Sequence, residues 1–132
     1  MIVENSGLLT VAALNKLKVK NKRIVSILSG GNMDVITMSS VVQQGLIYRD
    51  RIFTVSVLLP DKPGQLAQVS ALIAELDGNV IKLEHNQFIT TNRNDAVELR
   101  ITMEAFGTEH KKSIMDALYS GGYRPKIVRT NL

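Results

Sequence analysis

The stretch of sequence that decides the fold is Leu59-Pro60-Asp61-Lys62-Pro63-Gly64-Gln65-Leu66, which we call the Pro-Gly turn. The residues before it, 52–59, alternate in side-chain character as a β-strand does, and the apolar residues after it recur at helical spacing. Proline fixes φ and removes a backbone donor, while glycine allows the backbone to approach another group closely. We therefore expect a strand-to-helix turn that presents free backbone amides to a small molecule.

Outward from the turn, the same two periodicities predict the other elements of this part of the chain. In chain order we expect a strand at 52–59, a helix at 65–76, a strand at 80–88, a hairpin loop at 90–95, a strand at 97–104, a helix at 109–120 and a short strand at 124–128. This order predicts a ferredoxin-like βαββαβ arrangement of the α+β class, with both helices on one face of a four-stranded antiparallel sheet.

Within that sheet, the strand at 80–88 is expected to carry Ile81 and Leu83 on one face. The sheet face away from the helices is predicted to be polar enough to meet solvent or a second copy of the chain. Its expected residues are Thr54, Ser56, Glu98, Arg100 and Thr102. The ferredoxin-like fold hosts many unrelated functions, so it predicts none of them by itself.

The first 48 residues predict a helix, a strand and a second helix. We expect a helix at 4–17, a short buried strand at 24–28, and a helix from about Asp34 that Gly45 ends. A lone strand has no neighbour to satisfy its backbone donors and acceptors, so this part looks like a piece of something larger. We therefore divide the chain into residues 1–48 and a domain at 49–132.

Composition limits the function further. The chain has 132 residues, of which 45% are hydrophobic, and it has no cysteine, which excludes disulfides and thiolate chemistry. No apolar run approaches the roughly 18 residues that a membrane span needs, and the first residues lack a basic signal-peptide region. We expect a soluble, cytoplasmic protein with no membrane partner.

The net charge of +4 raises the question of a nucleic-acid partner. Five of the sixteen basic residues lie in the connector 16–23, and no aromatic residue lies between them to stack on bases. A solvated connector is the better interpretation, so we expect no nucleic-acid partner.

Catalytic residue patterns are largely missing. The two histidines, His85 and His110, accompany no carboxylate cluster at ligand spacing, so no metal site is predicted. His85 is interpreted as a solvated or interface histidine and His110 as an exposed residue in the first turn of its helix. Neither belongs to a visible nucleophile-base pair, and an independent enzyme is therefore disfavoured.

Four segments of the chain are distinctive in this order: Glu4-Asn5-Ser6-Gly7, Ile24-Val25-Ser26-Ile27-Leu28-Ser29-Gly30-Gly31-Asn32, the Pro-Gly turn and Glu84-His85-Asn86. Taken together, they resemble the C-terminal end of a threonine ammonia-lyase (threonine dehydratase) with a single ACT-type regulatory domain. The resemblance covers essentially the whole chain. It implies that residues 1–48 are the end of a fold-type II catalytic domain that uses pyridoxal phosphate, with a linker, and that 49–132 is an ACT domain.

For the cofactor, the resemblance implies that Ser29 faces the pyridine nitrogen of pyridoxal phosphate in the full-length parent, with Gly30 beside it. The parent would convert threonine to 2-oxobutanoate and ammonia. No segment of the family kind supplies a Schiff-base lysine or a phosphate-binding loop. We therefore expect the chain alone to hold no cofactor and to be catalytically inactive.

For the ACT part, the resemblance implies an amino-acid effector bound where the Pro-Gly turn of one copy meets the second strand of another. Gly64 would let the effector carboxylate approach the first helical amides, and Asp61 would either accept from the effector ammonium group or cap the turn. The other expected contacts are Pro63, Gln65, Leu66, Val80 and Ile81. A homo-oligomer follows, with a dimer formed through the ACT domain and a tetramer as a further possibility.

The identity of the effector is left open between isoleucine or valine, as in isoleucine biosynthesis, and a nucleotide. The family histidine that matches His85 is usually followed by Asp and Arg, whereas Asn86 and Gln87 follow here. A pocket formed by Leu66, Val80 and Ile81 favours a branched amino acid.

Two other functions compete with effector binding by an enzyme's regulatory domain. An amino-acid-responsive transcription regulator would need a helix-turn-helix in the first third, but the helix expected at 34–44 contains no Lys or Arg. A purely structural dimerisation module with an empty effector site is the other alternative, and ligand binding discriminates it.

Overall fold

The computed structural model describes residues 3–86 and 96–132, so the hairpin loop predicted at 90–95 and the end of the strand predicted at 80–88 lie outside the described residues. The chain divides into two compact units, Met1–Val42 and Gln43–Leu132. No helix among the described residues is both long enough and apolar enough to cross a membrane.

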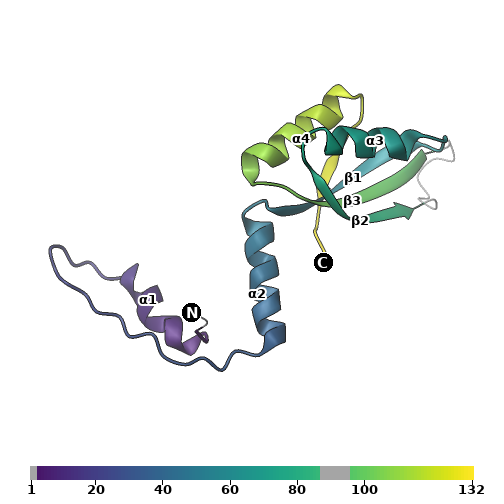
Figure 1. Ribbon diagram of the computed structural model, residues 1–132. Coiled ribbons are helices and arrows are strands. Elements are labelled where there is room, and N and C mark those ends of the chain that lie inside the picture. Colours follow the sequence, from purple (N-terminus) through teal and green to yellow (C-terminus); the bar gives the residue numbers. More distant parts are fainter. Residues whose placement is uncertain (1–2, 87–95) are drawn as a thin grey trace. The chain divides into compact units, whose positions relative to one another are not determined.

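The second unit contains the predicted sheet. The described residues form strands β1 (Ile52–Pro60), β2 (Asn79–Asn86), β3 (Ala96–Glu104) and β4 (Lys126–Val128), which pair antiparallel in the order β2-β3-β1-β4. Helices α3 (Gln65–Ala74) and α4 (Thr108–Ser120) lie together over one face of this sheet (Figure 1). The predicted ferredoxin-like βαββαβ arrangement is confirmed.

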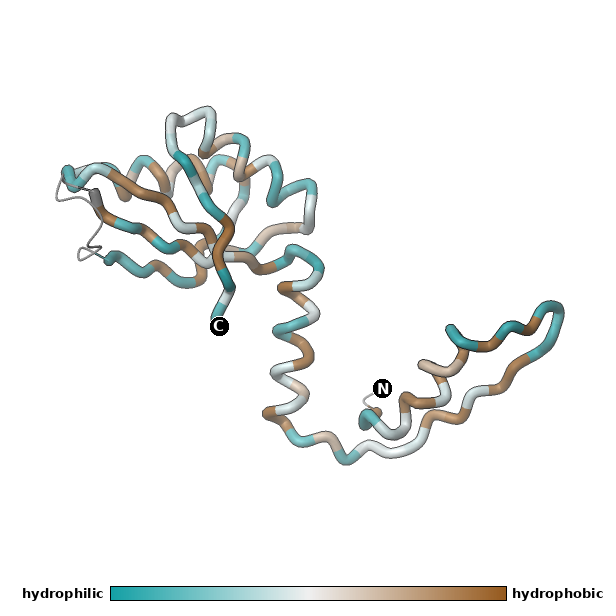
Figure 2. The backbone as a smooth tube through the Cα atoms, turned by 180° about the vertical axis from the view of Figure 1, so that it is seen from behind, coloured by the Kyte–Doolittle hydropathy of each residue, from teal (hydrophilic) through white to brown (hydrophobic). Residues whose placement is uncertain are grey.

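The core lies between the two helices and the sheet. Alternate residues of the central strands point toward the helices, and in Figure 2 the strands accordingly change between brown and paler or teal segments. The buried side chains that meet there are Phe53, Val55, Val57 and Leu59 of β1, Leu99, Ile101 and Met103 of β3, Val69 and Ile73 of α3, and Ile114 and Leu118 of α4. Burying this apolar surface is the main stabilising contribution to the fold.

Helices α2 (Val35–Tyr48), α3 and α4 all end in the same hydrogen-bonded motif. In α2, Arg51 N–H donates to Leu46 O at 2.8 Å and Asp50 N–H to Ile47 O at 3.1 Å, with Asp50 at φ 53°. This is a Schellman motif, in which a left-handed residue satisfies the last carbonyls. Our prediction that Gly45 ends the helix was wrong, because the left-handed residue is Asp50.

Strand β2 departs from the predicted alternation. Its register with β3 shifts between Val80 and Lys82, which makes Ile81 the extra residue of a bulge. Beyond the bulge, Leu83 lies opposite Ile101 on the helix-facing side, while Ile81 is 45% exposed. The expectation that Ile81 and Leu83 share one regular face was therefore wrong, because a bulge interrupts the two-residue period.

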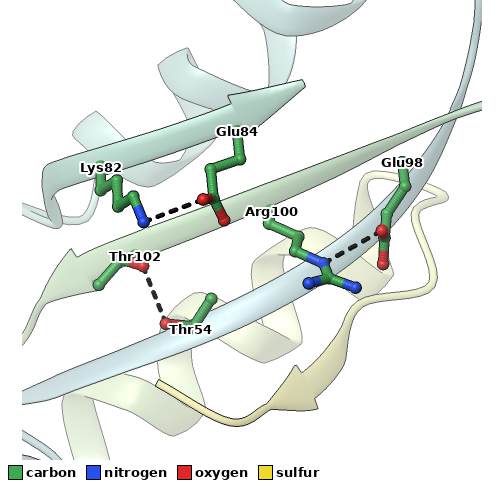
Figure 3. Close-up of polar contacts among 6 residues, drawn as sticks. All are labelled: Thr54, Lys82, Glu84, Glu98, Arg100 and Thr102. Carbon is green, nitrogen blue, oxygen red and sulfur yellow. Dashed lines mark hydrogen bonds and ion pairs between the residues drawn. The ribbon is translucent and has the colours of Figure 1, made fainter. Parts of the chain in front are cut away.

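The sheet face away from the helices carries the expected polar residues, but most of them are buried already in the single chain. Thr54 and Thr102 share a hydrogen bond of 2.9 Å, and Arg100 pairs with Glu98 at 3.1 Å beside the Lys82–Glu84 pair (Figure 3). The Ser56 hydroxyl donates to Glu98 Oε1 at 2.5 Å. The residues partner one another across the strands, as cross-strand pairs do.

Glu98 makes stability depend on pH. The hydrogen bond from Ser56, and after it the contacts with Arg100, hold the pKa of Glu98 below its ordinary value of 4.5, although burial opposes this. A lowered pKa means that ionised Glu98 stabilises the fold above pH 4.5 and that this contribution disappears as the pH falls through the folded-state pKa. We expect Ser56→Ala to lower the free energy of unfolding by about 1 kcal/mol at neutral pH and less below pH 4.

Urea unfolding between about pH 7 and pH 3 tests this linkage. Thr54→Val is the matched control, because it also removes a hydroxyl from this face of the sheet. The hydrogen-bond partner of that hydroxyl is Thr102, which does not titrate. The cost of Thr54→Val should be the same at every pH. A cost of Ser56→Ala that is equally independent of pH would contradict the role of Glu98.

The first unit has less regular structure than expected. A short 3₁₀ helix at Ser6–Leu8 leads into α1 (Leu9–Leu14), so the predicted helix at 4–17 is present but shorter. The helix α2 begins after Asp34, whose Oδ1 accepts from Thr37 N–H at 2.8 Å as an N-cap does.

The buried strand predicted at 24–28 is absent from this unit as described. Val25 is 88% exposed and Ile27 is 72% exposed. The segment instead contacts α1 through an isolated hydrogen bond from Thr10 Oγ1 to Ile27 O at 2.9 Å, and just after the segment Gly30 O accepts from Glu4 N–H at 3.3 Å. The prediction was wrong because a strand needs a neighbouring strand to pair with, and the described residues of this unit offer none.

Candidate functional site

A cleft of about 330 Å³ opens beside the Pro-Gly turn, and we call it the turn cleft. It lies where β1 ends and α3 begins, at the end of the sheet where β2 also finishes. Its lining residues are Leu59, Pro60, Asp61, Lys62, Pro63, Gly64, Gln65, Leu66, His85, Val97 and Leu99. Five of the predicted effector contacts, from Asp61 to Leu66, thus line one cavity.

The turn itself has the geometry of a type II β-turn. Gln65 N–H points to Lys62 O at 3.4 Å, Pro63 occupies the second position, and Gly64 occupies the third with φ 89° and ψ −15°. Type II turns favour proline at the second position and require a positive φ at the third, a conformation that glycine adopts readily. A Cβ at Gly64 would meet no heavy atom within 4 Å, so backbone conformation and not crowding explains the glycine.

The turn leaves the start of α3 without a side-chain cap. Gly64 is the N-cap, and the amides of Leu66 and Ala67 find no acceptor among the residues that the structure describes. The uncapped amides and the helix dipole favour a negatively charged group at this point. The alternative role of Asp61 as a cap is not realised here, because no side-chain cap of α3 is formed by any described residue.

His85, which was not among the predicted site residues, reaches the turn cleft from β2. It lies opposite Leu99, which places it on the same face of the sheet as the core. The two-residue period that placed Ile81 and Leu83 on one face also places His85 on that face, so the sequence did contain a pattern that could have identified it. His85 was instead interpreted as a solvated or interface histidine.

Val80 and Ile81 are not brought to this cleft within one chain. Val80 lies opposite Met103 at the start of β2, whereas His85 lies near its end, and Val80 packs against the core. The exposed Ile81 lies in the bulge next to it.

Ser29 and Gly30 belong to the other compact unit. Gly30 has φ 81°, and a Cβ there would lie 2.0 Å from Glu4 Oε1. Gly7 is likewise crowded, because its Cβ would lie 1.6 Å from the Ser29 carbonyl oxygen. These glycines are explained by the close contact of two segments of the chain.

The residues around Ser29 do not by themselves fit pyridoxal phosphate. The space beside Gly30 is filled by the Glu4 side chain, and no described residue supplies a phosphate-binding loop there. The exposed Ser29 hydroxyl is the single matching group. We therefore derive no chemistry through this cofactor.

The other histidine has a structural role. His110 is half-buried in the first turn of α4, where its Nδ1 accepts from Phe106 N–H at 3.0 Å and its Nε2 contacts Leu76 O at 2.5 Å. Its ring also stacks on Phe106 with the ring centroids 4.8 Å apart. The expectation that His110 is exposed was wrong, because its ring ties α4 to the end of α3. Within the described residues, no group of three or more His, Cys, Asp or Glu could hold a metal ion.

Comparison with known proteins gives a consistent result. The family model described as ACT domain matches residues 53–119. The chain is 31% identical to a Thermotoga maritima protein named L-threonine ammonia-lyase, over 97% of this chain and 32% of that protein. It is 33% identical to a Geobacter sulfurreducens protein of the same name, over 98% of this chain and 33% of that protein.

A Halalkalibacterium halodurans protein named L-threonine dehydratase biosynthetic IlvA is 25% identical over 99% of this chain and 31% of that protein. The chain thus spans about a third of the length of these relatives.

Proposed function

The chain belongs to the ACT domain family and is related to threonine ammonia-lyase, and on this premise we propose that its turn cleft binds a small effector that regulates such an enzyme. The observation that carries the proposal is the uncapped start of α3 beside a cleft of about 330 Å³ that Gly64, Gln65 and Leu66 line. The parent enzyme would use pyridoxal phosphate to convert threonine to 2-oxobutanoate and ammonia. Residues 1–48 would then be the end of its catalytic domain, and Ser29 and Gly30 would approach the cofactor only if the rest of that domain supplied the phosphate site and the Glu4 side chain moved away from Gly30.

The chemistry of the cleft favours an amino acid as the effector. An effector carboxylate would accept from the amides of Leu66 and Ala67, at the positive end of the helix dipole. Asp61 lines the same cleft and forms no side-chain hydrogen bond to another described residue, which leaves its carboxylate available to an ammonium group. Opposite charges on one small ligand match these two groups.

The walls of the cleft favour a branched apolar side chain. Leu59, Leu66, Val97 and Leu99 contribute apolar surface, and the volume lies at the lower end of the range for small-molecule sites, roughly 300–1,000 Å³. A cavity of this size suits isoleucine or valine better than a nucleotide. The name of the Halalkalibacterium halodurans relative, which includes the word biosynthetic, agrees with an amino-acid effector.

We also propose that a second copy of the chain completes the site. Strand β2 is at the edge of the sheet, and its residues from Ile81 to Asn86 are exposed. An unpaired strand edge is suited to pairing with another chain. In a dimer, Ile81 and the neighbouring Val80 of one copy would approach the turn cleft of the other, and two dimers would form a tetramer.

Thermal unfolding with a panel of isoleucine, valine, threonine, AMP and ADP tests the proposed function. At a concentration one hundred times the dissociation constant, isoleucine or valine should stabilise the chain by about 2.7 kcal/mol and raise the midpoint by roughly 10 °C. Sedimentation under the same conditions establishes whether the chain is dimeric.

Two results would oppose the proposal. A dimeric chain that no compound stabilises would favour the structural dimerisation module, and stabilisation by AMP or ADP alone would replace the amino acid with a nucleotide. The transcription-regulator alternative has less support, because α2 (Val35–Tyr48) contains no Lys or Arg to contact DNA.

A further inference from the structure

A second cleft, of about 480 Å³, lies in the same compact unit as the sheet, away from the Pro-Gly turn. The last turns of α2, the start of β1, the first turn of α4 and the chain from β4 onward surround it. None of its lining residues lines the turn cleft. We call it the tail cleft.

One side of the tail cleft holds an ion pair that leaves donors available. Lys111 Nζ lies 2.7 Å from Asp50 Oδ1, and Asp50 Oδ2 accepts from Thr108 Oγ1 at 2.9 Å. These two hydrogen bonds, with Lys111 as the larger contribution, hold the pKa of Asp50 below its ordinary value, so its charge is balanced by Lys111. An ammonium group has three N–H donors, and this pair uses one of them.

Arg129 adds a second cation to the lining. Its guanidinium forms no ion pair or side-chain hydrogen bond with any residue in the described ranges 3–86 and 96–132. Asp50, Lys111 and Arg129 are the lining residues with charged side chains, so these side chains together carry one positive charge in excess. A guanidinium with free donors binds a carboxylate or phosphate through paired hydrogen bonds.

The rest of the lining is apolar next to these cations. Ile47, Ile52, Phe53 and Ile127 line the cleft, and the Phe53 ring lies 5.5 Å from Lys111 Nζ. Apolar walls beside a small number of charged groups are typical of small-molecule sites, and the volume lies within their usual range. A fully hydrated inorganic anion would use the cations but not the apolar walls.

We propose that the tail cleft is a second small-molecule site, which binds a small organic carboxylate with a short apolar body. Arg129 and the free N–H groups of Lys111 contact the carboxylate, while Ile47 and Ile127 cover the apolar body. The site differs from the turn cleft in its binding groups, because side-chain cations and not helix amides hold the anion. It does not depend on effector binding at Gly64.

An NMR titration of the ¹⁵N-labelled chain tests this site with 3-methylbutanoate as the probe. Saturable shifts are expected for the amides around Ile47, Phe53, Lys111 and Arg129. The uncharged amide of the same acid, 3-methylbutanamide, has the same size and should bind at least about tenfold more weakly, because it lacks the charge that Arg129 recognises. Inorganic phosphate should also bind more weakly, because it lacks the apolar body.

The matched variants are Arg129→Gln and Arg124→Gln. Both positions are exposed, so neither change should disturb the fold, but Arg124 does not line the tail cleft. Arg129→Gln should weaken binding of 3-methylbutanoate about tenfold, and Arg124→Gln should leave it unchanged. The proposal is overturned by the absence of saturable shifts at the cleft, by equal binding of the amide or of phosphate, or by equal effects of the two substitutions.

Discussion

Replacing Gly64 with valine is expected to abolish the stabilisation that isoleucine or valine gives to this chain, a loss of about 2.7 kcal/mol at one hundred times the dissociation constant. Gly64 has φ 89° in a type II turn, so a β-branched residue there is strained by about 1–2 kcal/mol. The space around it is open, and the new side chain would therefore occupy the approach to the amides of α3. Thermal unfolding with and without the amino acid measures both effects.

The control for this prediction is Gly122→Val. Gly122 has φ 86° and, like Gly64, has no heavy atom within 4 Å of a would-be Cβ, but it lies after α4 and does not line the turn cleft. Both variants should lose similar stability without ligand, while Gly122→Val should keep its full response to the amino acid. An equal response of the two variants would show that the effector binds elsewhere.

The fold could be predicted because the two faces of the sheet have different environments. In β3, Val97, Leu99, Ile101 and Met103 are each no more than 3% exposed, and the residues between them are polar. Such strict alternation specifies both the strand and the face that the helices cover. The end of α4 could be predicted from a local signal of another kind, because Gly122 is the left-handed residue that the Schellman motif of this helix requires.

The features that could not be predicted depend on partners far away in the sequence. The bulge at Ile81 is defined by how β2 pairs with β3. The residues of β2 alone contain no pattern that predicts this pairing. The apolar run at 24–28 has the composition of a buried strand, but it becomes one only if a neighbouring strand pairs with it. Glu98 was assigned to an exposed polar face, whereas Ser56 and Arg100 accommodate it in a buried network.

The same distinction applies to the turn cleft. The Pro-Gly turn could be predicted as a candidate ligand site because a local sequence of prolines and glycine determines its backbone. His85 and Val97 were missed because the register of three strands, and not the turn, brings them to the same cleft as Leu66. Sequence reasoning therefore identified the part of the cleft that is contiguous in the chain.

The largest expected loss of stability comes from the core, where Leu118→Ala should lower the free energy of unfolding by about 2–5 kcal/mol. Leu118 is fully buried on α4 and packs in the cluster that includes Ile114 and the apolar face of the sheet. Alanine retains the helix but leaves a cavity that neighbouring side chains fill only in part.

Because single domains have only about 5–15 kcal/mol of stability in total, this one truncation should remove a large fraction of it. Leu58→Ala makes the matched comparison, since Leu58 is 58% exposed on β1 and lies outside the core cluster, and it should cost less than about 1 kcal/mol. Chemical denaturation of both variants gives the two values. If the two variants lost similar free energy of unfolding, the interface between α4 and the sheet would contribute less stability than its burial implies. The strands β1 and β3, which carry residues of the turn cleft, would then be held less firmly than their packing indicates.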